Sequence, residues 1–404
     1  MPSHELRVAI VADDLTGAMD AAAPFARRGL NVQVLTSPDD VARVVRNAPQ
    51  VLSINSDTRH FTPENAFTVV NNLVGSLVTC NPELVVKKID STLRGHVVAE
   101  TAAAMQATGY QEVLVCPAVP SQGRTFRGGK VYINDIPLAH TAIGRDHRSP
   151  PPTASLQELF KKLMPGIAVQ QTNIENLYAT KSSRGAPTIR ITDAETDDEL
   201  LTLSRLVLEQ RSATLFVGAS GLTEALAELL LGPGFPFVKE SSLPGINLFV
   251  VGSQAPQARL QAETLRARDP NVRILDLSGA EPLTPAQLEN LAADYQAHSS
   301  IILQTPRNSL EIAYDANQLA MALADSAARI MACVPVGFLL ATGGDTALAI
   351  LKALNVRVVR VCGEVQPGVV HSLIELEKDT LRLVTKAGGF GDANLFCTVR
   401  DYFQ

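Results

Sequence analysis

Short apolar segments alternate with segments of helical periodicity along the first 116 residues of the chain. The apolar segments are Val8–Ala12, Val32–Leu35, Val51–Asn55, Leu84–Lys88 and Val113–Cys116. Helices are predicted over 16–28, from about Asp39, from about Pro63 and over His96–Ala107, where apolar residues recur at helical spacing. Largely apolar strands that alternate with helices predict a parallel sheet covered on both faces. Pro24 lies inside the first helix and should kink or shorten it.

Residues 117–153 interrupt this alternation with many prolines and glycines. Lys130–Pro137 is predicted as one arm of a hairpin, and the rest of this segment as a long surface loop. The alternation then resumes with Thr188–Ile191, a helix over 196–209, Thr214–Gly218 and a helix over 221–231. A second series comprises Ile246–Gly252, helix 254–266, Val272–Leu275, a helix near 284–296, Ser300–Leu303, a long helix within 309–330, Gly337–Ala341, helix 345–354 and Val356–Val361.

The segment 232–245, GPGFPFVKESSLPG, separates the two series and has the composition of a linker. The sequence therefore predicts an α/β protein with two domains, residues 1–231 and 246–404, each a mainly parallel sheet flanked by helices. A chain of 404 residues is long enough for two separate cores.

Composition narrows the classes of protein that the chain can belong to. Hydrophobic residues make up 46% and charged residues 19%, which excludes wholesale disorder. The net charge is −6, so we expect no nucleic-acid partner and no binding to an anionic membrane. Five widely spaced cysteines without a CxxC pair suggest neither a zinc site nor a disulfide framework.

No apolar stretch reaches the length of a membrane span, and the N-terminus does not resemble a signal peptide. We therefore expect a cytoplasmic protein with small-molecule partners. The leucine-rich helix 221–231 could pack between subunits or in the core, which leaves a homo-oligomer open.

Charged and polar residues follow three of the predicted strands in the first half. Asp13 and Asp14 follow the first strand, Arg59 follows the third, and the fourth runs into Lys88, Ile89, Asp90, Ser91 and Arg94. Ligands of open α/β sheets gather at the carboxyl ends of strands. Cations can bind a carboxylate there, and aspartates can bind hydroxyl groups. The alternative is ordinary: Asp14 or Thr16 caps the next helix, and the lysines are surface charges. The loop 117–129 could close over this crevice.

Glycine turns mark the second half. Ser253 follows a strand as Val-Val-Gly-Ser-Gln, and an apolar strand runs into Gly343, Gly344, Asp345 and Thr346 before a helix. Glycines let a backbone approach an anion, and a helix N-terminus offers free N–H groups. The alternative is a tight turn capped by Asp345. Further glycine turns follow at Gly363–Gly368 and Gly388–Gly391. The chain has no GxxxxGK[ST] loop, and no GxGxxG follows the first strand of either half, so a P-loop and a dinucleotide fold are disfavoured.

These strings resemble the four-carbon acid sugar kinase family over nearly the whole chain. The resemblance rests on VADDLTGAMD (11–20), SDTR (56–59), KKIDSTLRG (87–95), CPAVPSQGRTFRGGKVYINDIPL (116–138), VGSQAP (251–256), ATGGDTA (341–347), CGEVQPGV (362–369) and KAGGFG (386–391). It implies an N-terminal domain that holds the sugar acid and a C-terminal domain that holds ATP. It also implies a ligand cleft between the domains.

Position by position, the resemblance implies two sets of site residues. The sugar-acid set is Asp13, Asp14, Arg59, Lys88, Ile89, Asp90 and Ser91, and the ATP set is Ser253, Gly343, Gly344, Asp345, Thr346, Gly388, Gly389 and Gly391. A carboxylate must accept the proton of the attacking hydroxyl, and either Asp14 or Asp345 could do so. Mg²⁺ is expected with ATP, but its ligands are not identified.

The resemblance predicts transfer of the γ-phosphoryl group of ATP to the terminal hydroxyl of a tetronate. D-threonate, giving D-threonate 4-phosphate, is the leading substrate, and D-erythronate or 3-oxotetronate is the alternative. A different class, a sensor that binds a sugar acid or nucleotide without turnover, is disfavoured because the chain carries both constellations. Domain closure about a hinge near 232–245 is also expected.

Overall fold

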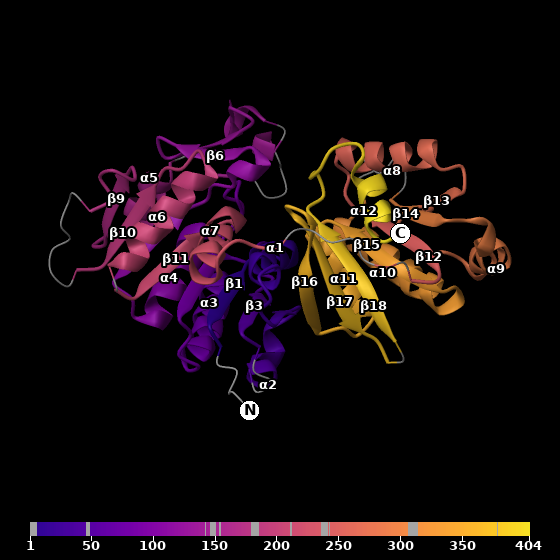
Figure 1. Ribbon diagram of the computed structural model, residues 1–404, viewed down its shortest axis with the longest axis horizontal. Coiled ribbons are helices and arrows are strands. Elements are labelled where there is room, and N and C mark those ends of the chain that lie inside the picture. Colours follow the sequence, from indigo (N-terminus) through magenta and orange to yellow (C-terminus); the bar gives the residue numbers. More distant parts are fainter. Residues whose placement is uncertain are drawn as a thin grey trace. The chain divides into compact units, whose positions relative to one another are not determined.

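The computed structural model describes residues 6–45, 49–141, 143–145, 151–152, 155–178, 186–210, 212–235, 241, 243–305, 314–377 and 379–404. The chain divides into two compact units, Met1–Phe235 and Pro236–Gln404, and the division falls inside the segment 232–245. Each unit combines a mainly parallel sheet with helices (Figure 1), so the predicted α/β class is confirmed.

The first unit is built on a sheet of parallel strands in the order β2-β3-β1-β4-β11-β5-β10-β9. The strands are β1 (Val8–Ala12), β2 (Val32–Leu35), β3 (Val51–Asn55), β4 (Leu84–Lys88), β5 (Glu112–Cys116), β9 (Ala168–Thr172), β10 (Thr188–Thr192) and β11 (Thr214–Gly218). Every residue of β1, β3, β4 and β11 is buried, as expected for strands that carry helices on both faces.

Helices cover this sheet in two groups. They are α1 (Leu15–Ala26), α2 (Val41–Val45), α3 (Pro63–Val78), α4 (Val97–Thr108), α5 (Leu156–Leu163), α6 (Asp197–Glu209) and α7 (Ser220–Leu231). Helices α1, α7 and α6 pack side by side, and α2, α3, α4 and α5 form the other group. Right-handed crossovers place these groups on opposite faces. Helix α1 follows β1 and helix α4 follows β4, and the two helices lie on opposite faces of the sheet. A crevice therefore opens at the carboxyl ends of these neighbouring strands.

The segment after β5 differs from the prediction. It forms a small antiparallel sheet of β6 (Arg124–Arg127), β7 (Lys130–Ile133) and β8 (Ile136–Pro137), where a loop and one hairpin arm were predicted. Phe126 is buried in β6, and its backbone pairs with Ala194, which anchors this sheet to the unit. Helix α5 and strand β9 were not predicted, because β9 has no alternating or continuous apolar pattern. Helix α1 ends at Ala26, two residues after Pro24.

The second unit has the strand order β13-β14-β12-β15-β18-β17-β16, parallel from β13 to β18 and antiparallel from β18 to β16. The strands are β12 (Ile246–Val251), β13 (Val272–Asp276), β14 (Ser300–Gln304), β15 (Val336–Thr342), β16 (Val358–Gln366), β17 (Val369–Glu375) and β18 (Thr380–Lys386). The antiparallel strands β17 and β16 were not predicted as a pair. The Gly363–Gly368 stretch belongs to their hairpin, so it is not a strand-to-helix turn.

The helices of this unit are α8 (Pro256–Arg268), α9 (Pro285–Asp294), α10 (Ala316–Cys333), α11 (Gly344–Ala353) and α12 (Leu395–Tyr402). Helix α8 packs against α12, whereas α9 and α11 pack against α10. Phe249 of β12 and Phe338 of β15 pack with Phe396 of α12 in a core that α8 also covers. The helices α8 and α12, which follow β12 and β18, therefore lie on one face of the sheet. Helix α11, which follows the intervening strand β15, lies on the other face. This alternation opens a second strand-end crevice.

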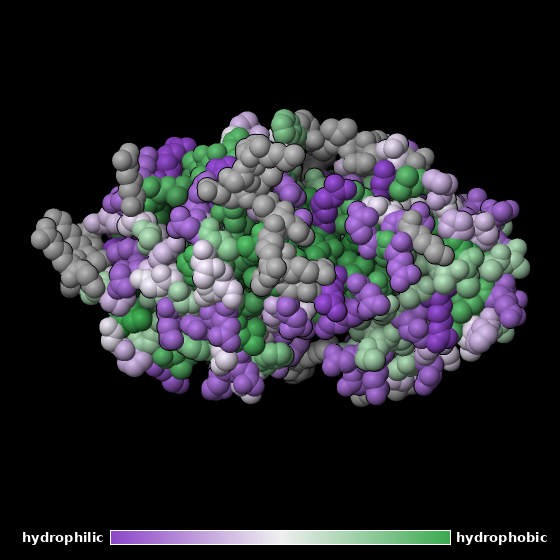
Figure 2. All heavy atoms as spheres, turned by 90° about the horizontal axis from the view of Figure 1, so that it is seen from below, coloured by the Kyte–Doolittle hydropathy of each residue, from purple (hydrophilic) through white to green (hydrophobic). Residues whose placement is uncertain are grey.

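Apolar side chains are scattered on the surface. Figure 2 shows hydrophilic and hydrophobic residues interspersed on the face in view, and the most exposed apolar side chains, such as Phe235 and Met321, are distant from one another in the sequence. Among the described helices, none has both the length and the hydrophobicity that a bilayer crossing requires.

One buried ion pair supports the carboxyl end of β4. The Nζ of Lys87 lies 2.7 Å from Oε2 of Glu100 on α4, and these side chains are 0% and 1% exposed. Lys87 also donates to the carbonyl of Val11 on β1, and Thr58 donates to Oε1 of Glu100 at 2.7 Å. The pair therefore links β1, β4, α4 and the segment after β3 beneath the crevice.

We expect Glu100→Gln to lower the free energy of unfolding by about 3–5 kcal/mol, because it leaves the ammonium of Lys87 buried without its counter-charge. Glu83→Gln is the matched control, since the Arg7–Glu83 pair is exposed and should contribute about 0–1 kcal/mol. Urea unfolding of both variants measures the difference, and equal losses would contradict the structural role assigned to Glu100.

Candidate active site

The crevice of the first unit gathers charged residues from three strand ends. Arg59, after β3, donates from Nε to Asp13 Oδ2 at 2.7 Å and from Nη1 to Asp14 Oδ2 at 3.0 Å. Its Nη2 lies 3.7 Å from Asp90 Oδ1, after β4. Parallel register explains the meeting, because Ala12 pairs with both Asn55 and Lys88 at the last positions of these strands. The structure thus brings Asp13, Asp14, Arg59 and Asp90 together.

A second arginine fixes Asp90. The Nε and Nη2 groups of Arg94 each lie 2.9 Å from one oxygen of the Asp90 carboxylate, a bidentate contact that restrains both side chains. The backbone N–H and the hydroxyl of Thr92 also bond Asp90. Ser91 accepts a hydrogen bond from Arg124 of β6. Part of the segment 117–129 therefore lies against the site, although Arg127 pairs instead with Glu195.

Asp14 serves as a helix cap as well as a site residue. Its Oδ1 accepts from the backbone N–H of Gly17 at 2.9 Å, and its Oδ2 accepts from the hydroxyl of Thr16 at 2.8 Å. The ordinary alternative of an N-cap is therefore correct for Asp14, but it does not exclude the contact with Arg59. Both oxygens of Asp14 have protein partners. Asp13 differs, because its buried Oδ1 has no partner among the described residues.

Electrostatics keeps the carboxylates of the crevice ionised. Burial by itself raises the pKa of Asp14, but Arg59 and Lys88 outweigh it and hold that pKa below its usual value. For Asp90, Arg94 and Arg59 overcome burial and hold the pKa well below 3.8. Burial also opposes the charge of Arg59, yet the three aspartates raise the pKa of its guanidinium well above normal.

Lys88 supplies hydrogen-bond donors that the protein does not use. Its Nζ donates to the carbonyl of Ile89 at 2.9 Å, and an ammonium has three N–H groups. Two of these donors have no partner among the described residues. Ile89 is held in place because its N–H bonds the carbonyl of Gly218 on β11. The crevice therefore offers free N–H donors beside carboxylates, a combination that suits an anionic, hydroxylated ligand.

Asp20 is a neighbour of the crevice that was not predicted. It lies on α1 one turn after Thr16, and burial raises its pKa although Lys88 and a hydrogen bond from Ser220 act against this. Its Oδ1 is buried without a partner among the described residues. The i, i+4 spacing of Thr16 and Asp20 on a helix that follows a strand end could have identified it.

The crevice of the second unit is formed by three turns that follow β12, β15 and β18. Gly388 packs so closely on Ser253 that a Cβ there would lie 2.8 Å from the Ser253 Cβ. A Cβ on Gly252 would likewise lie 2.9 Å from the Cβ of Thr346. The backbone N–H of Gly343 donates to the carbonyl of Lys386 at 2.9 Å. The structure therefore places three of the four predicted glycine turns at one sheet edge, and the fourth, Gly363–Gly368, belongs to the hairpin of β16 and β17.

The start of α11 differs from the alternative in which Asp345 is the cap. Gly343 is the N-cap residue, with φ +90° and no side chain to cap the helix, and Gly344 begins the helix. Asp345 lies exposed in the first turn, where the helix N-terminus favours a negative charge. Ser253 caps no helix, because α8 begins at Pro256 and its N-cap residue is Ala255. A helix N-terminus with glycines before it can accept an anion such as phosphate.

The turn after β18 is held from inside the unit. Lys386, the last residue of β18, donates from Nζ to the carbonyls of Ala387, Gly388 and Phe390 at 2.9–3.1 Å. Gln261 of α8 is fully buried and donates to the carbonyls of Phe390 and Asp392. Neither residue was predicted, because the glycine motif gives no sign of what lies beneath it.

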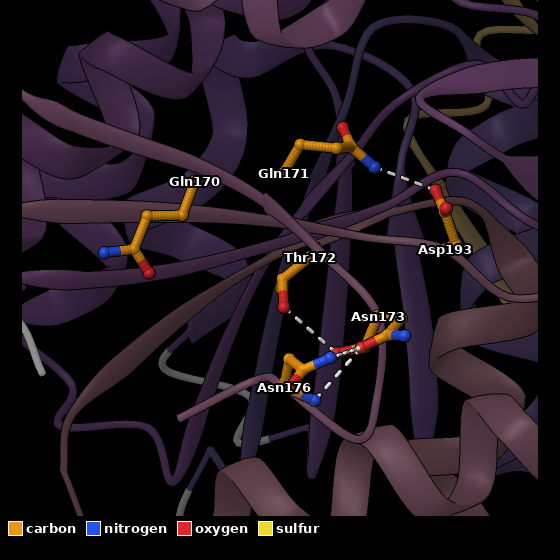
Figure 3. A pocket seen from close by; sticks show the side chains of 6 residues that line it. All are labelled: Gln170, Gln171, Thr172, Asn173, Asn176 and Asp193. Atoms are coloured by element: carbon orange, nitrogen blue, oxygen red, sulfur yellow. Dashed lines mark hydrogen bonds between the residues drawn. The ribbon is translucent and has the colours of Figure 1, made fainter. Parts of the chain in front are cut away.

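A separate polar pocket lies at the far edge of the first unit's sheet (Figure 3). It has a volume of about 400 Å³ and is lined by Gln170, Gln171, Thr172, Asn173, Asn176 and Asp193. Strands β11, β5 and β10 separate it from β4 and the charged crevice. Most of its polar groups bond one another, such as Gln171 with Asp193 at 2.8 Å. It is therefore not part of the predicted site.

Comparisons with known proteins agree with this division into two units. A model described as a sugar-binding N-terminal domain matches residues 8–226, and one described as a nucleotide-binding C-terminal domain matches residues 248–396. The D-threonate kinase of Bordetella bronchiseptica is 32% identical, covering 96% of this chain and 95% of that protein. The D-threonate kinase of Salmonella typhimurium is 27% identical, covering 99% of each. The D-erythronate kinase of Heliobacterium modesticaldum is 28% identical, covering 98% and 96%.

The chain belongs to the four-carbon acid sugar kinase family. Solved structures share its fold: a Salmonella typhimurium LT2 protein has a TM-score of 0.78 at 20% identity, covering 99% of this chain and 100% of that one. A Haemophilus influenzae protein has a TM-score of 0.73 at 19% identity, covering 98% and 100%.

The lowered pKa of Asp90 predicts a pH-dependent contribution to stability. A carboxylate whose folded pKa lies below its unfolded value stabilises the fold above about pH 3.8, and this contribution fades as the pH falls toward the folded pKa. We expect Asp90→Asn to be much less stable than wild type at pH 7, with a smaller gap at pH 2.5. Asp294→Asn, in an exposed pair with Arg273, should show a small gap at both. Urea unfolding at each pH measures these gaps, and a gap for Asp90→Asn that widens in acid would contradict the assignment.

Proposed function

We propose that this protein is an ATP-dependent kinase that phosphorylates the terminal hydroxyl of D-threonate to give D-threonate 4-phosphate. The carrying observation is the crevice of the first unit, where unused donors of Lys88 lie beside fixed carboxylates. Such a site can bind a carboxylate and a hydroxyl group at once. Two relatives named D-threonate kinase support this substrate over D-erythronate and 3-oxotetronate, which the names of other relatives carry.

In this proposal the first unit binds the sugar acid. The carboxylate of the tetronate takes the free N–H donors of Lys88, with Arg94 nearby. The partnerless Oδ1 of Asp13 is the acceptor left for a hydroxyl group. Arg59 acts mainly on the protein, because its donors are already directed at Asp13 and Asp14. Ile89, Asp90 and Ser91 shape the crevice from the end of β4.

The second unit binds ATP in the same proposal. Ser253, the Gly343–Thr346 helix start and the Gly388–Gly391 turn surround one strand-end crevice, and helix N-termini and glycine turns are suited to phosphates. Mg²⁺ in kinases is commonly held by one or two carboxylates together with the phosphates, and exposed Asp345 fits that pattern. Within the described residues no three acidic, histidine or cysteine side chains cluster as a metal site of their own. When bound, Mg²⁺ neutralises charge on the transferring phosphoryl group.

We propose that Asp345, and not Asp14, is the carboxylate that takes part in the reaction, by holding Mg²⁺ or by accepting the proton of the attacking hydroxyl group. Asp14 receives hydrogen bonds on both oxygens, and its pKa is held low by Arg59 and Lys88, which makes it a weak base. Asp345 is exposed in the first turn of α11, so its carboxylate can reach a ligand. Much of the remaining rate enhancement comes from holding the hydroxyl group of the sugar acid in line with the γ-phosphoryl group of ATP.

A coupled assay of ADP release tests the substrate. Mg-ATP is offered with D-threonate, D-erythronate, their L forms, 3-oxotetronate and glycerate, the last as a shorter control. We expect turnover with D-threonate at least tenfold above every other acid. Turnover with a different tetronate would keep the kinase and replace the substrate, whereas ligand binding without ADP release would favour a sensor.

Two variants test the division of labour between the units. Arg59→Ala should weaken D-threonate binding at least tenfold and leave ATP binding intact, because it frees Asp13 and Asp14 to repel an anion.

Asp345→Asn should lower turnover about 10²–10⁴-fold while D-threonate binding survives. The controls are Arg7→Ala and Asp379→Asn, which lie at the opposite strand ends. Titration calorimetry and kinetics measure both properties, and loss of ATP binding in Arg59→Ala would refute the first assignment.

A further inference from the structure

Lys386 is a buried lysine that binds only backbone carbonyls. It is the last residue of β18, and it is 1% exposed. The Nζ lies 3.0 Å from the carbonyl oxygen of Ala387, 2.9 Å from that of Gly388 and 3.1 Å from that of Phe390. An ammonium has three N–H donors, so these three carbonyls use all of them.

No counter-charge explains this burial. Within the described residues Lys386 has no ion-pair partner, and burial alone lowers its pKa to about 7. Lys87, the comparable buried lysine at the end of β4, is paired with Glu100 at 2.7 Å. A buried ammonium without a carboxylate is costly for the folded state. An apolar side chain would avoid that cost, so the three carbonyl contacts need a reason other than stability.

The reason lies in the direction of the peptide groups. In a trans peptide the N–H points opposite to the C=O, and the described chain has no cis peptide bond. The carbonyls of Ala387, Gly388 and Phe390 point toward Lys386, so the N–H groups of Gly388, Gly389 and Gly391 point away from it. No hydrogen bond from these three N–H groups occurs within the described residues.

We propose that Lys386 is a positioning residue that presents the N–H groups of Gly388, Gly389 and Gly391 to a phosphate group of the nucleotide. Several N–H groups directed to one side of a turn form an anion-binding concavity. Gln261 assists from α8 by holding the carbonyls of Phe390 at 3.0 Å and Asp392 at 2.9 Å. The inference rests on the proposed nucleotide site and adds the group that gives one of its turns its shape.

Binding of ADP and of adenosine to the full chain tests this role. Lys386→Met keeps the apolar stem and removes the three hydrogen bonds. We expect the Kd for ADP to rise at least tenfold while the Kd for adenosine changes less than twofold, because only phosphate contacts are lost. Lys352→Met, an exposed lysine of the same unit, is the control for loss of one charge and should leave both constants unchanged.

The outcomes separate this proposal from others. An unchanged Kd for ADP in Lys386→Met, or an equal loss of adenosine and ADP, would overturn it. If Lys386→Met does not fold, Gln261→Met provides the test, with an expected rise of about threefold in the Kd for ADP only, and no rise would overturn the proposal. Wild-type protein that binds no ADP would instead refute the nucleotide site itself.

Discussion

The handedness of the crossovers is the constraint on which both candidate sites depend. A right-handed connection places each helix on one face according to the direction in which the chain moves along the sheet. In the first unit β1 and β4 are neighbours whose helices leave to opposite faces, and in the second unit β15 has this relation to β12 and β18. Such positions leave space at the strand ends, so the topology of the sheet favours ligand binding there before any side chain is considered.

Charge balance is the second organising feature of the first unit. Asp13, Asp14 and Asp90 face Arg59, Arg94 and Lys88, so the described crevice contains equal numbers of anionic and cationic groups. The attraction between the paired groups offsets the desolvation cost that each of these groups has when it is buried. It also means that a ligand carboxylate must use donors that the aspartates leave free. In the second unit the donors available to an anionic ligand are neutral, because they are backbone N–H groups of the turns.

Much of this arrangement was predictable because it depends on local signals. Apolar strands followed by Asp-Asp or Gly-Gly-Asp identify strand ends, and parallel strands bring those ends to one edge. The predicted strand Val356–Val361 covers only the start of β16, and its antiparallel partner β17 and the polar strand β9 were missed, because their pairing depends on neighbours distant in sequence. Asp20 and Lys386 were missed for the same reason: the partners that define their environment come from other elements. Asp14 was predicted with two competing roles, and its two oxygens accommodate both.

The place of β11 in the first unit has a consequence for the order in which the chain can assemble during synthesis. This strand, residues 214–218, is the last of its sheet in sequence but lies between β4 and β5. The N–H of Ile89 also bonds the carbonyl of Gly218. A nascent chain shorter than about 218 residues therefore exposes two unpaired apolar strand edges in the middle of the sheet, and such edges invite aggregation. The sheet of the first unit can therefore be completed only after more than half of the chain has been translated.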